Sequence, residues 1–449
     1  MDAHDLKLIA LAMAAVGVLV LLVTKLKVNP FIALLLAALL AGCGAGLAGG
    51  AVLKSFQEGF GLTLGGVAGV IGLGVMLGKL LAESGGAEVL AKRFNAFFGP
   101  SRAGWCIMAL AVVIGLTTWF AVGLLLLLPV LLTLTKESGR PFLLLAIPLI
   151  SCLSVMHGLM PPHPGPVIAV EALKANTGLV LLWGFVIGLP VAAVAGPVFA
   201  RRAAKRVQAN PPQPAARETS PTLRAPGFGL TLFSMLLPVA LMLMATLAEL
   251  TLEKGNGVRE AATFIGHPVM ALTIAVLFAL WSLGLHCGHS KSRLLKFTEE
   301  SIGTIGMTLL VVGAGGGFAR VLRDAGVADS LGHLAQAWHL PPLLFGWMVA
   351  AFIRVATGSA TVAITAAAGV LAPLLGTMPD VNRELLVICI GCGSLFLSHL
   401  NDGGFWIVKD CLGLTVGQTL RTWTVTETIV GLAGLLLTLT VDFVWRLLT

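Results

Sequence analysis

Long apolar runs without a charged residue recur along the chain and decide its secondary structure. They cover residues 28–53, 59–78, 103–135, 175–200, 225–248, 301–319 and 355–379. A helix of roughly 17–25 residues crosses the apolar layer of a bilayer. Strands of a membrane barrel would instead alternate apolar and polar residues over about ten positions. Since backbone groups in lipid must be hydrogen-bonded internally, these runs predict transmembrane helices.

Composition supports a membrane protein. The 449 residues are 57% hydrophobic and 11% charged, whereas soluble domains carry roughly a quarter charged residues. The first apolar run, residues 8–24, follows Asp2 and Asp5 and precedes no small-residue cleavage site, so we expect it to be retained. We predict an all-α polytopic membrane protein with about 11–14 transmembrane segments.

The formal charge of +8 does not point to a nucleic acid, because much of it lies in short connections. The basic group at Arg201, Arg202, Lys205 and Arg206 precedes a Pro-rich polar stretch. The positive-inside rule places such a stretch in the cytoplasm. We therefore predict a first membrane repeat over residues 1–205, a cytoplasmic linker over 206–226 and a second repeat over 227–449.

The two halves contain matching segments in the same order. Residues 72–88 resemble 313–329, and residues 29–40 resemble 267–280. Residues 157–162 align with 399–404 at a similar distance along the sequence. Duplicated halves are typical of secondary transporters, which hold the substrate between the repeats. An acidic start and a basic first loop favour an external N-terminus. Since the linker is expected in the cytoplasm, the first half would then cross the membrane an odd number of times. We therefore predict that the two repeats are inverted.

Residues 154–166 contain His157 and His163, with four prolines among residues 161–166. Proline lacks the amide donor that a helix needs, so this stretch interrupts the helix. Freed carbonyls at membrane depth face protein or a wet cavity. We predict that the stretch lines a cavity in which Pro162 and His163 contact the substrate and His163 responds to protonation. An extramembrane loop is the alternative.

A second interruption lies at residues 354–365, where Arg354 is the only charge between residues 340 and 379. Gly358, Ser359 and Thr361 suit the tip of a re-entrant hairpin, whose amides and hydroxyls hold an anion. Arg354 is a candidate partner for a substrate carboxylate. In the alternatives, Arg354 reaches a membrane interface or neutralises a protein carboxylate.

The third interruption covers residues 393–406. Ser398 and Asn401 are candidate substrate-binding residues, and His399 and Asp402 could relay a proton because both can titrate near neutrality. In the alternative, Asp402 caps the next helix and His399 bonds to the backbone.

Two further features carry candidate chemistry. Glu427 is a candidate for proton coupling, or a favourable charge near a predicted helix start. Cys389 and Cys392 have metal-ligand spacing but lie in an apolar run. We interpret them as packing residues.

At these motifs the chain resembles the gluconate permease family of proton symporters over nearly its whole length. The resemblance rests on residues 59–65, 72–85, 161–166, 358–363, 398–406 and 422–428. It implies a multi-pass permease of the bacterial inner membrane for gluconate or a related sugar acid, with D-serine also transported within the family. It further implies inverted repeats with re-entrant hairpins and a possible homodimer. The expected partners are a sugar-acid anion and the lipid bilayer, with the proton as coupling ion and no cofactor.

One departure from the family pattern concerns residues 119–123, Trp-Phe-Ala-Val-Gly. Many relatives carry a carboxylate where Ala121 stands. If that group couples protons, coupling in this chain uses another residue, for which His163, His399 and Asp402 are candidates, or the substrate preference differs.

Several other functions are compatible with parts of the sequence. A sodium-coupled carboxylate carrier or a D-serine transporter would use a similar scaffold. A channel is a further alternative, but duplicated halves with interrupted helices fit a transporter better. A membrane enzyme could use His157, His163, His399 and Asp402 as zinc ligands. The sequence contains neither HExxH nor GxSxG, and these motifs mark the commonest zinc and serine hydrolases.

Overall fold

The structure is a computed structural model, and it describes residues 3–207, 209, 224–303, 305–327, 330, 341–377, 380–400 and 402–448. The first half contains α1 (Ala3–Thr24), α2 (Pro30–Gly44), α3 (Gly49–Glu83), α4 (Gly86–Phe98), α5 (Ala103–Gly115), α6 (Phe120–Ser138), α7 (Leu143–Leu159), α8 (Pro164–Leu173), α9 (Thr177–Ala193) and α10 (Phe199–Arg206).

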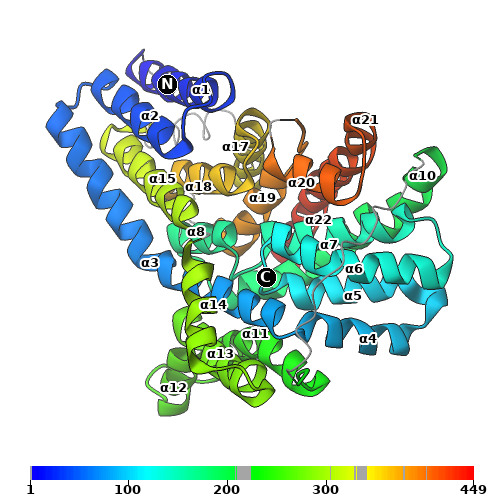
Figure 1. Cartoon of the computed structure of the whole chain (residues 1–449). Helices are drawn as coiled ribbons and strands as arrows, with labels where there is room; N and C mark the ends of the chain where they lie inside the picture. The colour runs from blue at the N-terminus through cyan, green and yellow to red at the C-terminus, as the bar shows by residue number, and fades with distance from the viewer. Residues whose placement is uncertain are drawn as a thin grey trace.

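The second half contains α11 (Phe228–Thr251), α12 (Gly257–Gly266), α13 (Pro268–Ala279), α14 (Lys291–Gly303), α15 (Gly306–Asp324), α17 (Pro342–Thr357), α18 (Ala360–Leu371), α19 (Arg383–Leu395), α20 (Gly403–Cys411), α21 (Val416–Thr419) and α22 (Val425–Leu448). A π-helical turn joins α21 to α22. Figure 1 shows the arrangement, and the described residues contain no strand.

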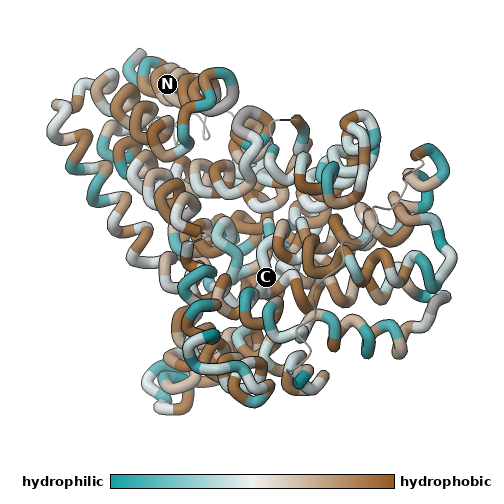
Figure 2. Tube along the Cα trace, in the orientation of Figure 1, coloured by the Kyte–Doolittle hydropathy of each residue, from teal (hydrophilic) through white to brown (hydrophobic). Residues whose placement is uncertain are grey.

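The all-helical polytopic architecture is confirmed. Among the described residues, six helices are long and apolar enough to cross a membrane, or seven if the bent pair within α3 counts as one span. Four shorter apolar helices of 10–17 residues accompany them. Apolar residues predominate along most of these helices in Figure 2. The exact number of spans, the inversion of the repeats and a homodimer stay predictions. Most of the predicted linker lies outside the described residues.

Three helix breaks fall where the sequence predicts them. Helix α7 ends at Leu159 and α8 begins at Pro164, since the intervening prolines interrupt the hydrogen-bond ladder. Helix α17 ends at Gly358, which has a left-handed φ of 74°, a conformation that glycine adopts without steric cost. The third break separates α19 from α20.

Both halves follow one order of elements. Two helices on either side of a tight break (α5–α6 and α17–α18) precede a broken helix (α7–α8 and α19–α20), and a long helix with an internal π-helical turn comes next. Each half thus has one hairpin and one broken helix, while the repeat and its bounds stay predictions.

Helices α3 and α15 pack antiparallel at short range because glycines lie at their contact. A Cβ atom built on Gly59 would lie 2.4 Å from the backbone oxygen of Gly316, and one built on Gly317 would lie 2.7 Å from the ring of Phe56. Small residues allow such close approach of helices in membranes.

Ion pairs also join α3 to the second half, one beside the glycine contact and one near the C-terminal end of α3. Arg320 on α15 pairs with Asp324 and, at 3.3 Å, with Glu58 on α3. Lys79 on α3 pairs with Glu83 at 2.8 Å and with Glu300 on α14 at 3.3 Å. The two clusters tie the first half to the second.

The glycine contact predicts a difference between two neighbouring substitutions. Gly59→Ala should lower stability by about 1–3 kcal/mol, since the added methyl group meets backbone that cannot yield. Gly61→Ala is the matched control, because nothing lies within 4 Å of a Cβ atom at Gly61. It should be neutral or stabilising by up to about 1 kcal/mol. Thermal unfolding of the two purified variants in detergent measures both; equal unfolding temperatures would contradict the close contact.

Candidate functional site

The three interrupted segments meet at one cavity of about 300 Å³. Its polar and charged lining residues come from α7, the α17–α18 hairpin, the start of α20 and the last long helix. They are Ser154, His157, Arg354, Ser359, Thr361, Asp402 and Glu427. The wall is completed by Trp119, Phe120, Ala121, Trp423 and several small or apolar residues. Segments far apart in sequence thus form one site, which we call the central cavity.

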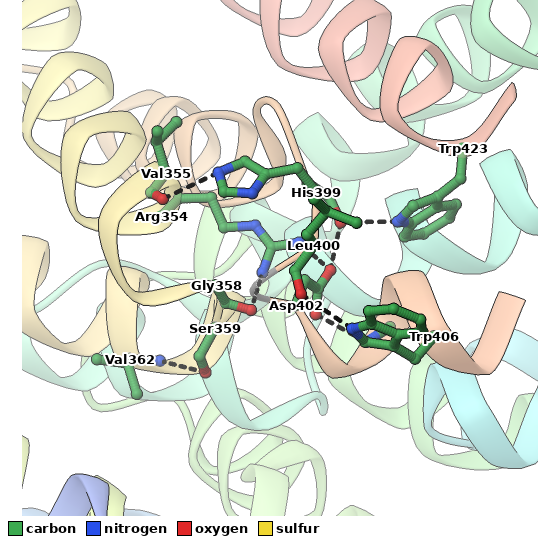
Figure 3. Close-up of polar contacts among 12 residues, drawn as sticks. Arg354, Val355, Gly358, Ser359, Val362, His399, Leu400, Asp402, Trp406 and Trp423 are labelled. Atoms are coloured by element: carbon green, nitrogen blue, oxygen red, sulfur yellow. Dashed lines mark hydrogen bonds and ion pairs between the residues drawn. The ribbon is translucent and has the colours of Figure 1, made fainter. Parts of the chain in front are cut away.

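A buried ion pair lies at the centre of this site (Figure 3). The Arg354 Nη2 atom is 2.5 Å from Asp402 Oδ2, and the Arg354 side chain is 3% exposed. Arg354 also donates from Nη1 to the carbonyl oxygen of Gly358 at 2.6 Å. Its Nε atom is buried and has no hydrogen-bond partner among the described residues. Arg354 therefore neutralises a protein carboxylate in this conformation.

Asp402 holds several partners at once. Its Oδ1 atom accepts from the amide of Gly404 at 2.7 Å, which caps the start of α20, as expected of aspartate at a helix N-cap. Its Oδ2 atom accepts from the Ser398 hydroxyl, which in turn accepts from the Trp423 indole at 2.7 Å. Asp402 thus joins the α19–α20 break to the hairpin and to the last long helix.

The hairpin tip presents small polar groups to the central cavity. The Ser359 hydroxyl accepts from the amide of Val362 and caps α18. Gly358 turns the chain, and Thr361 follows on the first turn of α18. The hydroxyl-rich tip predicted from the sequence is therefore beside Arg354, where its groups and the guanidinium can act on one anion.

Glu427 is the most isolated charged group of the site. Its side chain is 0% exposed, and neither carboxylate oxygen has a hydrogen-bond partner among the described residues. The Ser154 hydroxyl is close but outside hydrogen-bond geometry. Glu427 lies in the first turn of α22, near a helix start as the sequence predicts. The π-helical turn at 420–424 joins α22 to α21, so the helical backbone continues from Val416 to Leu447.

Other predicted site residues lie beside the central cavity. His163 is buried, and its Nε2 atom lies 2.5 Å from the carbonyl oxygen of Gly115. Pro162 is buried in the same break. The Nε2 atom of His399 lies 3.2 Å from the carbonyl oxygen of Val355 (Figure 3). Asn401 lies outside the described residues. Each histidine thus contacts the last turn of the first helix of its own hairpin.

Sequence reasoning missed the first hairpin. Residues 103–135 read as one apolar run, yet the structure has a break between α5 and α6 that brings Trp119 and Ala121 to the central cavity. The local signal is weak, since only Gly115 and two threonines mark the break within a continuous apolar run. The repeat could have revealed it, because the register that pairs Lys79 with Arg320 sets Thr118 opposite Ser359.

The geometry does not suggest a metal site. The described residues contain no group of three His, Cys, Asp or Glu side chains that could hold a metal ion. Cys389 and Cys392 are both buried within α19, and Cys392 packs against Gly434 of the last helix. Their interpretation as packing residues agrees with this environment.

Comparison with known proteins decides the family. Residues 6–444 match the GntP family of permeases. The chain belongs to this family. A gluconate permease of Pseudomonas aeruginosa is 41% identical over 98% of this chain and 99% of its own length. An L-idonate transporter of Escherichia coli is 41% identical over 96% of this chain and 98% of its own length. A D-serine transporter of Escherichia coli is 35% identical over 96% of this chain and 97% of its own length.

The fold is shared more widely than the sequence. The YdaH transporter of Alcanivorax borkumensis has a TM-score of 0.65 at 17% identity, covering 92% of this chain and 98% of its own. This GntP-family protein is therefore a multi-pass permease of the bacterial inner membrane and not an enzyme.

The Arg354–Asp402 pair makes a prediction for stability. Asp402→Asn keeps a side chain that can cap α20 but leaves Arg354 as an uncompensated buried charge. Breaking such a pair from one side costs about 3–5 kcal/mol. The double variant Arg354→Met/Asp402→Asn should recover a large part of this loss, because no lone charge remains. Thermal unfolding of the single and double variants in detergent gives the coupling energy; strictly additive losses would contradict the ion pair.

Proposed function

We propose that this permease carries gluconate or a related sugar acid into the cell together with protons. The supporting observation is the central cavity, which combines a paired cation, a hydroxyl-bearing hairpin tip and a buried carboxylate without a partner. The names of the relatives favour sugar-acid anions as substrates, and each chemical group of such an anion has a counterpart in the cavity.

The substrate carboxylate would bind at Arg354. A guanidinium can hold a carboxylate through two parallel hydrogen bonds, and Arg354 has a buried Nε atom with no partner among the described residues. Ser359 and Thr361 lie beside it on the hairpin. Hydroxyl groups of the sugar acid would contact this tip, His157 and Ser154. Of the other candidates, Ser398 and Pro162 would act by holding the two broken helices in shape.

Proton coupling would follow from competition for Arg354. When a substrate carboxylate binds this guanidinium, Asp402 loses its cationic partner while it remains buried. A buried carboxylate without a counter-charge is strongly disfavoured, so Asp402 would take up a proton. Substrate and proton would then bind together, as symport requires. Glu427 would carry a proton in the same cavity, because it has no counter-charge bonded to it.

The two predicted coupling histidines, His163 and His399, would act indirectly. Each contacts a backbone carbonyl of the hairpin in its own half. They would set the position of the hairpins relative to the broken helices, while His157, which lines the central cavity, is the histidine placed to contact substrate.

Uptake of labelled gluconate into proteoliposomes tests the proposal. An inward proton gradient should stimulate uptake, and unlabelled gluconate or L-idonate should compete. Replacing sodium by choline should leave uptake unchanged. Uptake that needs sodium and ignores the proton gradient would overturn the coupling proposal. Competition by D-serine but not by sugar acids would overturn the substrate.

Glu427→Gln provides a sharper test of coupling. The amide keeps the shape of the side chain but cannot exchange a proton. We expect stimulation by the proton gradient to fall by about ten-fold, within the usual range for energetic coupling between two ligands. Exchange of internal for external gluconate without a gradient should persist. Asp442→Asn on the same helix is the matched control, because Asp442 pairs with Arg446 away from the cavity. Unchanged stimulation in Glu427→Gln would remove Glu427 from the mechanism.

A further inference from the structure

A second cavity lies beside the central one. Its volume is about 370 Å³, and it is bounded by α3, the tip of the α5–α6 hairpin and the end of α14. Its polar lining residues are Lys79, Glu83, Thr117, Thr118, Glu300 and Ser301. Ligand sites in proteins typically measure about 300–1,000 Å³. The second cavity is therefore large enough for a small solute.

Trp119 is the residue that the two cavities share. It lines the central cavity together with Arg354 and Glu427, and it lines the second cavity together with Lys79 and Glu300. Its ring centroid is 6.5 Å from that of His157 in the central cavity. A single half-buried indole thus stands between two polar spaces.

The indole of Trp119 packs partly against the hydrophobic core, but its place at the start of α6 does not require it. Trp119 is the N-cap residue of α6 and makes no side-chain cap. Ser, Thr, Asp and Asn are the residues that favour this position. In the second hairpin the N-cap of α18 is Ser359, whose hydroxyl does cap its helix. Helix formation therefore does not explain the large side chain at Trp119.

The backbone around Trp119 is held in place, whereas its side chain lies at the cavity boundary. A Cβ atom built on Gly78 of α3 would lie 3.1 Å from the carbonyl oxygen of Thr117 and 3.2 Å from the Thr118 side chain. The Thr118 hydroxyl donates to the carbonyl oxygen of Ile114 at 2.7 Å. The tip is thereby fixed against α3, so rotation of the indole is the smallest movement that would join the two cavities.

We propose that Trp119 is a gate through which the substrate passes between the central cavity and the second cavity. The closed indole keeps the Arg354–Asp402 pair apart from the space around Lys79. Its rotation opens a passage with polar groups on both sides, suited to a polyhydroxylated anion. The identity of the transported substrate rests on the function proposed above, but the gate itself does not.

Thiol labelling tests the gate without any transport assay. The reporter is Ala121→Cys, which lines the central cavity and not the second. It is placed in a chain in which Cys43 and Cys411 are serine, since the other native cysteines are buried. Membrane vesicles of both orientations are treated with a membrane-impermeant anionic methanethiosulfonate. The labelling rate of Ala121→Cys is measured in three backgrounds, which carry Trp119, Trp119→Phe or Trp119→Ala.

We expect Trp119→Ala to speed labelling of the reporter from one side of the membrane by about ten-fold, which corresponds to a barrier lowered by about 1.4 kcal/mol. Trp119→Phe should stay within about two-fold of the parent, because a ring of similar width still closes the passage. A second reporter, Arg323→Cys, lies in a different cleft and should be labelled at the same rate in all three backgrounds.

Equal labelling of Ala121→Cys in the Trp119 and Trp119→Ala backgrounds would overturn the gate. So would faster labelling of both reporters, since that result indicates general loosening of the fold. Neither result depends on gluconate or protons. A failed gate and a failed transport proposal are therefore distinguishable.

Discussion

The buried ion pair between Arg354 and Asp402 is the interaction on which the rest of the site depends. A guanidinium inside an apolar protein is tolerated only with a counter-charge and hydrogen-bond acceptors. Asp402 and the carbonyl oxygen of Gly358 supply these. Because the pair joins the tip of one hairpin to the start of α20, neutralising the charge also fixes the shape of the cavity. The same contact gives the site its chemistry, since an anion that binds Arg354 competes with a group that can take up a proton.

Close helix packing allows so many interrupted segments to meet. Hairpin tips and broken helices expose backbone groups that lipid cannot satisfy, so they must lie within a surrounding shell of helices. Helices α3 and α15 form part of this shell through contacts as short as that between Gly59 and Gly316. The Arg320–Glu58 pair lies beside this contact, and the Lys79–Glu300 pair joins the far end of α3 to α14. Small residues at the contact permit the close approach expected of helices within a bilayer.

The sequence predicted the parts of the fold that have a local cause. Charge-free runs predicted the helices, prolines predicted the end of α7, and Gly358 predicted the hairpin tip. It could not show that Arg354 pairs with Asp402, because that contact depends on how two distant segments pack. It also missed the break at Thr117–Trp119, because Gly115 and the two threonines are only weak signals inside a long apolar run and the packing of the tip against α3 is a contact between distant segments. Glu427 lies near a helix start as predicted, but the sequence did not show the π-helical turn that joins this helix to α21.

The position of Glu427 bears on the unusual residue at Ala121. The family resemblance implies a carboxylate at that position in many relatives, and here an alanine lines the central cavity instead. Glu427 lines the same cavity from another helix and brings a buried carboxylate to it. A proton site within a cavity is defined by burial and by the charges around it, so a carboxylate entering from a different helix can serve the same cavity. The acidity that the sequence lacks at Ala121 is thus present in the space that Ala121 faces.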